Sequence, residues 1–165
     1  MPRKPKPSHA ESFFSPKKAL IFSLENVLIP GKYVEGVDVL ASKRFLKQIM
    51  GFCSKKGIAT YLISAYPEKV CEQKVKEFGL GSFFAPENVR GVHSAYLTGM
   101  EAVDRARYNS KLADDAECTD EYFRQVEMQS IMKEKGWEGR DLVLIGHNYW
   151  FDGFYTRRYS QVDVA

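Results

Sequence analysis

Three short segments of this sequence place hydroxyl, carboxylate and imidazole side chains directly after apolar runs. Ser23 and Glu25 follow the first run, Ser64 ends the second, and His147 and Asp152 follow the third. A serine hydroxyl becomes a nucleophile when a base activates it, carboxylates transfer protons, and carboxylate oxygens bind magnesium. These residue types would suit a metal-assisted hydrolytic site if the fold brings the three segments together.

The runs that precede these side chains have the pattern of strands that are buried on both faces. They cover Ala19–Phe22, Ile58–Ser64 and Asp141–Gly146, and helical periodicity lies between them at Val37–Phe52 and Glu68–Phe78. Strands that alternate with helices predict a parallel sheet with helices on both faces, a three-layer Rossmann-like α/β fold. Such sheets bind ligands beyond the carboxyl ends of their strands, so we expect the three polar segments to converge there.

The remaining elements are shorter or less regular in pattern. The sequence predicts a short strand at Asn88–Val92, helical segments near Ala95–Ala113 and Thr119–Lys135, and a last short strand within Tyr159–Val164. Thr119 has the residue type of a helix N-cap. We therefore expect a small helical insertion between the second and third polar segments, and no large cap.

In these strand tips the chain resembles the haloacid dehalogenase (HAD) superfamily over about residues 18–164. That family ends its first strand in Asp-x-Asp, its second in Ser or Thr, and carries Gly-Asp followed by another Asp in its last motif. The resemblance implies the fold expected above and a magnesium-dependent phosphatase site. In the family the first Asp attacks phosphorus, the second is the acid/base, a Ser/Thr and a Lys hold the phosphoryl oxygens, and the last acids hold magnesium.

This chain departs from the family at the two central acids. Ser23 stands at the position of the nucleophilic Asp, and Glu25 stands at the position of the acid/base Asp. A neutral hydroxyl attacks weakly without a base and brings no charge to a metal ion. Glu25 keeps a carboxylate but extends it by one methylene, and a displacement of about 1 Å can cost on the order of a hundredfold in rate.

The metal-binding positions are also altered. His147 matches the first metal-binding Asp, and Asp152 matches the second at the longer of the two spacings that the family uses. Magnesium prefers oxygen ligands to imidazole, so we expect His147, Asp152 and Glu25 to form a weak magnesium site or none.

The phosphate-binding positions are only partly recognisable. Ser64 matches the hydroxyl that holds a phosphoryl oxygen, although a serine at a strand tip is also a common turn former. Lys111 is the first candidate for the phosphate-binding lysine, with Lys133 and Lys135 as alternatives, because no Lys-Pro motif fixes the alignment.

Composition and charge favour one intracellular domain with a basic arm. The chain has 165 residues, three cysteines without Cys-x-x-Cys spacing and no apolar run of about 18 residues, so we expect reduced thiols and no membrane span. We expect a Pro-rich arm over residues 1–17 and a single cytoplasmic domain over 18–165. Residues 1–18 carry a net charge of +4 against a total of +3 for the chain, and the near-neutral remainder argues against a broad nucleic-acid-binding face.

Three functions are consistent with these features. The first is a non-catalytic binding or scaffold module that uses the old cleft or a helix face for a protein partner. The second is a magnesium-dependent phosphomonoesterase or phosphotransferase in which Glu25, Asp152 and His147 share the work. The third is a nucleic-acid or ribonucleoprotein accessory factor that docks through the basic residues of segment 1–7.

Overall fold

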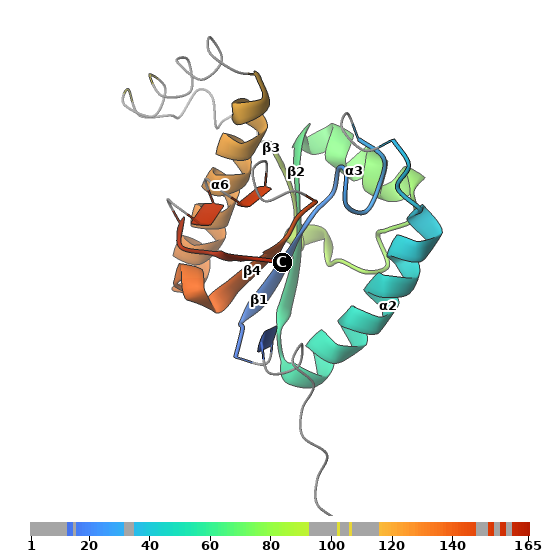
Figure 1. Cartoon of the computed structure of the whole chain (residues 1–165), viewed down its shortest axis with the longest axis horizontal. Coiled ribbons are helices and arrows are strands. Elements are labelled where there is room, and N and C mark those ends of the chain that lie inside the picture. The colour runs from blue at the N-terminus through green and yellow to red at the C-terminus, as the bar shows by residue number, and fades with distance from the viewer. Residues whose placement is uncertain are drawn as a thin grey trace, which may run out of the picture.

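Five parallel strands form one sheet in the order β3-β2-β1-β4-β5 in the computed structural model of this chain (Figure 1). The strands are β1 (Ala19–Ser23), β2 (Ala59–Pro67), β3 (Val89–Val92), β4 (Leu142–Ile145) and β5 (Asp163–Val164). The structure describes residues 13–14, 16–31, 35–92, 102, 106, 116–147, 152–153, 156–157 and 160–165, with backbone alone at 92 and 116–125.

Helices cover both faces of this sheet, as the sequence predicts (Figure 1). Helices α2 (Val39–Lys56) and α3 (Glu68–Glu77) pack on one face, and α6 (Ala116–Lys135) packs on the other. Two short 3-10 turns, Pro86–Asn88 and Gly139–Asp141, precede β3 and β4. The three-layer α/β fold is therefore confirmed. No large cap is present among the described residues.

The side chains of the central strands alternate between two apolar layers. Leu20 and Phe22 of β1 point toward α2 and α3, where they join Leu46, Cys53, Cys71 and Val75. Ala19 and Ile21 point the other way and pack with Met128 and Ile131 of α6. Burial on both faces explains why this strand has a continuous apolar sequence and no alternation of apolar and polar residues.

Local signals set the ends of α2. The Asp38 side chain accepts a hydrogen bond from the Ala41 amide over 3.0 Å, which caps the amino end. Gly57 adopts a left-handed φ of 68° beyond the last turn, where a residue with a Cβ would be strained. The chain then enters β2 beside β1.

Most predicted elements are found within a few residues of their expected bounds. The short strand at Asn88–Val92 is present as β3. Helix α6 begins at Ala116, so the prediction of Thr119 as its N-cap is wrong. The predicted helix at Ala95–Ala113 falls on residues of which the structure describes only 102 and 106.

Two features of the described residues concern the cysteines and the apolar segments. Cys53 and Cys71 are buried and free, with no disulfide between them. Within the part of the chain that the structure describes, no helix combines the length and the apolar character that crossing a bilayer requires.

Candidate functional site

The predicted site residues meet at the carboxyl edge of the sheet. Ser23 ends β1 and pairs in register with Ile63, so that Ser64 of β2 lies one step further along. Glu25 follows β1, and His147 follows β4 after Gly146. Asp152 reaches the same place, since its carboxylate contacts both Ser23 and His147. The convergence predicted from the three strand tips is thus found.

Glu25 is held by groups at the end of β2. Its Oε1 accepts hydrogen bonds from the Ser64 hydroxyl over 2.7 Å and from the Ala65 amide over 3.1 Å. Ser64 in turn accepts a hydrogen bond from the Tyr66 amide at 3.0 Å. Glu25 and Ser64 expose only 6% and 1% of their surfaces, so these bonds form away from bulk water. A buried carboxylate with two donors on one oxygen is fixed in position.

A tight loop after β1 aims Glu25 at β2. The Asn26 amide donates to the Ile29 carbonyl over 2.9 Å, and the Leu28 amide donates to the Leu24 carbonyl over 3.0 Å. Asn26 adopts a φ of 62°, a conformation that Asn tolerates better than most residues. A Cβ on Gly31 would lie 2.4 Å from Asn26 Oδ1, so only glycine leaves room for this side chain. Neither Asn26 nor Gly31 was singled out by motif comparison.

Asp152 lies between Ser23 and His147. Its Oδ1 accepts a long hydrogen bond from the Ser23 hydroxyl at 3.4 Å. Its Oδ2 accepts from the His147 amide over 2.7 Å and lies 2.7 Å from His147 Nδ1. Asp152 and Ser23 are 1% and 0% exposed. Gly146 permits this approach, because a Cβ there would lie 2.5 Å from the Asp152 Cβ.

This order of contacts determines what the serine can do. In a nucleophilic Ser-His-Asp site the imidazole contacts the serine and the carboxylate orients the imidazole. Here the carboxylate of Asp152 contacts both Ser23 and His147. Ser23 therefore contacts a carboxylate where such a site has an imidazole base. This arrangement suits a hydrogen-bond network better than nucleophilic attack by the serine.

The same contacts bear on a magnesium ion. Oε2 of Glu25 is buried and accepts no hydrogen bond from any described residue, so it is one oxygen that could face a cation. The other carboxylate oxygens already accept bonds from Ser23, Ser64, Ala65 or His147. Among the described residues, no group of three His, Cys, Asp or Glu side chains is placed to hold a metal. Magnesium is usually held by one or two carboxylates together with several waters, and Oε2 of Glu25 is the described carboxylate oxygen of this site that no hydrogen bond occupies.

Cys71 is a neighbour of the site that the sequence analysis did not select. Burial raises the pKa of its thiol to about 12, while a hydrogen bond with the Ser64 side chain opposes that rise. A thiol that stays protonated at neutral pH is a poor nucleophile. Cys71 therefore adds packing and a weak hydrogen bond to the site, and it adds no chemistry.

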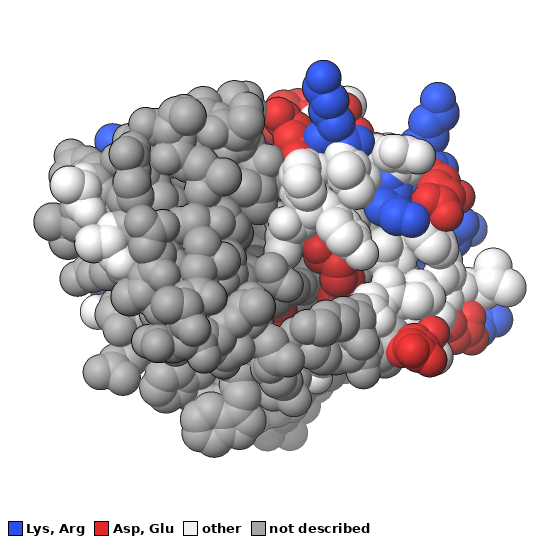
Figure 2. All heavy atoms as spheres, turned by 90° about the horizontal axis from the view of Figure 1, so that it is seen from above, with Lys and Arg blue, Asp and Glu red and all other residues white. Residues whose placement is uncertain are grey.

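The lysine candidates are not brought to this edge within the described structure. Lys111 lies outside the described residues. Lys133 and Lys135 lie in the last turn of α6, which leads through Gly139–Asp141 to the start of β4 and hence to the opposite edge of the sheet (Figure 1). Figure 2 shows the site edge from above: Asp and Glu atoms lie in a hollow that uncharged residues border on its right-hand side, and Lys and Arg atoms lie beyond these residues toward the top and right.

Comparisons with known proteins place the chain by its fold alone. No protein-family model matches it, and no curated protein matches it in sequence. Among solved structures it is similar to DsGPDH of Dunaliella salina, with a TM-score of 0.53 and 8% identity over 96% of this chain. The chain spans only 24% of that protein's length.

Two further solved structures are similar to this chain with lower TM-scores. One is the core domain of a Streptococcus pneumoniae protein provisionally named a phosphoglycolate phosphatase, with a TM-score of 0.45, 14% identity, and coverage of 90% of this chain and 77% of that one. The other is the cobalt-bound deoxy-D-mannose-octulosonate 8-phosphate phosphatase of Haemophilus influenzae, with a TM-score of 0.40, 10% identity, and coverage of 92% and 78%.

Proposed function

We propose that this chain is a degenerate HAD-like domain that binds a partner and does not hydrolyse phosphate esters. The observation that carries this proposal is the environment of Ser23, at the position where the family has its nucleophile. Its hydroxyl is fully buried and donates to Asp152, which is itself held by His147. A serine in these contacts cannot replace an aspartate that attacks phosphorus and binds magnesium.

The contact between Glu25 and Ser64 supports the same proposal. The resemblance assigns proton transfer to the first position and phosphoryl binding to the second. Here the Ser64 hydroxyl donates to Glu25 over 2.7 Å, so the two groups satisfy each other within the buried site. A phosphate that approached would find the Ser64 hydroxyl already bonded to Glu25 and the Ser23 hydroxyl already bonded to Asp152.

One observation favours a rearranged phosphatase as the second candidate. Oε2 of Glu25 is buried and has no hydrogen-bond partner among the described residues. Such an oxygen is costly to bury unless it holds a proton or faces a cation. A site that gained a metal ligand from elsewhere could use this oxygen, with Asp152 and His147 nearby.

Metal titration and phosphate release separate the two candidates. We expect no heat of magnesium or manganese binding to the metal-free protein, and no metal-dependent release of phosphate from p-nitrophenyl phosphate. Metal-dependent turnover that Glu25→Gln and Asp152→Asn both abolish, and that the matched surface variant Glu87→Gln retains, would establish the phosphatase instead. Thermal unfolding of each variant verifies that lost turnover is not lost folding.

A designed reversal tests the reason for the proposed inactivity. The double variant Ser23→Asp/Glu25→Asp restores both central acids, and we expect it to bind magnesium more tightly than the natural chain. If magnesium affinity does not change while the variant stays folded, the substitutions at Ser23 and Glu25 are not what prevents metal binding, and His147 becomes the position to replace next.

A further inference from the structure

Helix α2 has an unbalanced charge. It contains five Lys or Arg residues and no Asp or Glu. The remainder of the chain after Lys18 is near neutral in sum, but five of its 19 Lys and Arg residues lie on this one helix, which has no acidic residue of its own. The basic residues are Lys43, Arg44, Lys47, Lys55 and Lys56.

Three of these cations lie on the face of α2 that points to solvent. Leu46 and Cys53 are the buried residues of the helix and mark its inner side. On the outer side, five exposed residues follow one another at spacings of four, three, four and four residues, so they form one stripe along the helix. The stripe consists of Leu40, Arg44, Lys47, Gly51 and Lys55.

Little within the described structure neutralises this stripe. Arg44 lies 4.0 Å from Asp38, but their side chains are 76% and 63% exposed, so the pair is weak. The other four cations of α2 make no ion pair with any described residue. Like charges three and four residues apart destabilise a helix slightly. Helix α3 differs, since Lys74 pairs with Glu77 over 3.0 Å.

Two apolar features lie beside the cations. Leu40 is 69% exposed, and Phe45 is 44% exposed although its ring packs edge-on against buried Phe22. Gly51 lies within the helix with nothing within 4 Å of a Cβ built on it. No contact within the described chain requires glycine at this position, and its small size lets another backbone approach the helix closely.

Residues 16–18, which precede β1, lie at the carboxyl end of α2. The Ala59 amide donates to the Lys18 carbonyl over 2.8 Å, so the segment before β1 lies beside the turn at Gly57 that ends the helix. In Figure 1 the dark blue turn at Phe13–Phe14 lies near the same lower edge. The described residues before β1 therefore lie near the edge where α2 ends with Lys55 and Lys56.

We propose that the exposed face of α2 binds single-stranded nucleic acid. Arg44, Lys47 and Lys55 would contact phosphates along the strand, and the ring of Phe45 would stack on a base at the flank of the stripe. The stripe contains a single apolar residue, Leu40, which is too little for the continuous apolar face that a helix uses in a protein groove or on a membrane. This inference does not depend on the inactivity of the cleft, and it would hold for an active phosphatase as well.

Fluorescence anisotropy with a labelled oligouridylate of about 16 nucleotides tests the proposal. The charge variant Arg44→Gln/Lys47→Gln is compared with the control Lys69→Gln/Lys76→Gln, which removes two exposed lysines from α3. We expect the α2 variant to lose affinity by about tenfold or more, and its slope of log affinity against log salt to fall by about 1.4 between about 50 and 200 mM salt. The control should stay within about twofold of the natural chain.

Phe45→Leu separates stacking from charge. It keeps an apolar side chain in contact with Phe22, so folding is preserved, and circular dichroism melting verifies this for every variant. We expect an affinity loss of about fivefold or more for the single strand, with no change in salt slope and no change for a duplex of the same length.

Three results would overturn the inference. Absence of oligouridylate binding at about 50 mM salt would exclude it outright. Equal losses in the α2 and α3 double variants would show attraction by total charge without a site. Tighter binding of a polyglutamate peptide than of the RNA, lost in the α2 variant, would assign the stripe to an acidic protein.

Discussion

The hydroxyl of Ser64 donates a hydrogen bond to Oε1 of Glu25 over 2.7 Å, and both side chains are buried. The bond joins the end of β2 to the loop that follows β1, two segments that are 39 residues apart. The side chains that could have met a phosphate thus connect the centre of the sheet to its first loop. This gives the site a structural role that can be measured independently of any ligand.

The variant Ser64→Ala should therefore destabilise the protein. It removes a buried hydrogen bond to a carboxylate and also the acceptor of the Tyr66 amide, and we expect the free energy of unfolding to fall by about 1.5–3 kcal/mol. Urea denaturation measures this change. Ser130→Ala is the matched control, because its hydroxyl bonds Glu134 on the exposed side of α6 and should cost less than about 0.5 kcal/mol. Equal effects would show that the Ser64 bond contributes little.

Two glycine substitutions should change the free energy of unfolding in opposite directions. A Cβ on Gly146 would lie 2.5 Å from the Asp152 Cβ, so Gly146→Ala must displace Asp152 and we expect it to destabilise by about 1–3 kcal/mol. Gly51→Ala has open space within α2 and should stabilise by about 0.5–1 kcal/mol. Thermal unfolding of both variants measures whether each substitution lowers or raises the stability. Stability gained by Gly146→Ala would mean that Asp152 can move away at no cost.

The positions of the site residues could be predicted from sequence, because burial on both faces makes the strands continuous apolar runs. Ser23, Ser64 and His147 follow such runs, and parallel strands bring their carboxyl ends to one edge. The contacts among them could not be predicted. Whether Asp152 meets Ser23, His147 or a metal depends on a few ångströms of loop geometry, which side-chain type and spacing do not specify.

One sequence prediction was wrong for an identifiable reason, and one sum over the chain hides a local feature. Thr119 carries the local signal of an N-cap, yet α6 begins at Ala116, because packing can extend a helix beyond a favourable capping residue. The near-neutral net charge after the basic arm argues against a broad nucleic-acid-binding face, and this stays a prediction. A sum over the chain conceals the five cations that the fold places on α2.

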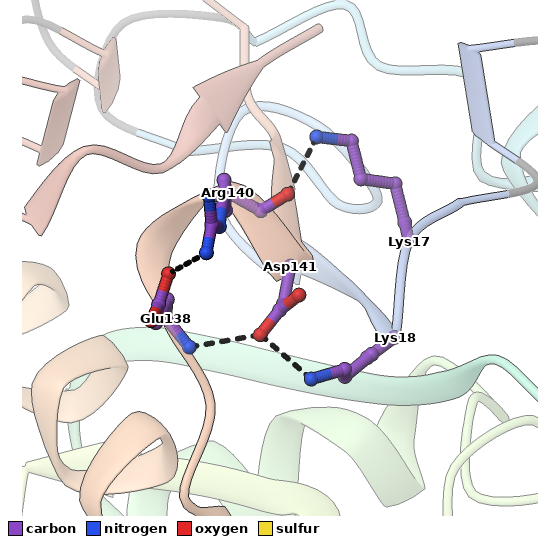
Figure 3. A network of polar contacts seen from close by, with 5 residues as sticks. All are labelled: Lys17, Lys18, Glu138, Arg140 and Asp141. Carbon is purple, nitrogen blue, oxygen red and sulfur yellow. Dashed lines mark hydrogen bonds and ion pairs between the residues drawn. The ribbon is translucent and has the colours of Figure 1, made fainter.

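Asp141 should make stability depend on pH in the acid range. The Glu138 amide and then Lys18, both 2.9 Å from Oδ2, hold the pKa of this carboxyl below its usual value (Figure 3). A lowered pKa in the folded state contributes stability that is present above the unfolded value near 4 and is lost as pH falls through the folded value. Asp141→Asn should thus lower the melting temperature at neutral pH, by a margin that shrinks below about pH 4.

A second variant distinguishes the two causes of that shift. Lys18→Gln removes the cation and leaves the Glu138 amide in place. Because the amide is the larger cause, we expect Lys18→Gln to change the acid dependence less than Asp141→Asn does. A melting temperature of Asp141→Asn that stays below that of the natural chain by a constant margin from neutral pH to about pH 2 would contradict the linkage.

Glu127 of α6 should make the stability of the protein fall as pH rises toward neutrality, which is the opposite of the effect of Asp141. It is 6% exposed, and burial raises the pKa of its carboxyl to about 7, with Arg90 lowering and Glu134 and Glu68 raising it. The folded state then holds a proton that the unfolded state has lost, so stability should decline as pH rises from about 4.5 to about 7. Glu127→Gln should abolish that decline and add up to about 3 kcal/mol near pH 8, measured by urea unfolding across the range. Glu134→Gln removes an acid that raises the pKa of Glu127 and keeps Arg90, which lowers it, so the decline in stability should move to lower pH. If the pH profile of stability in Glu127→Gln is the same as that of the natural chain, the proton belongs to another group.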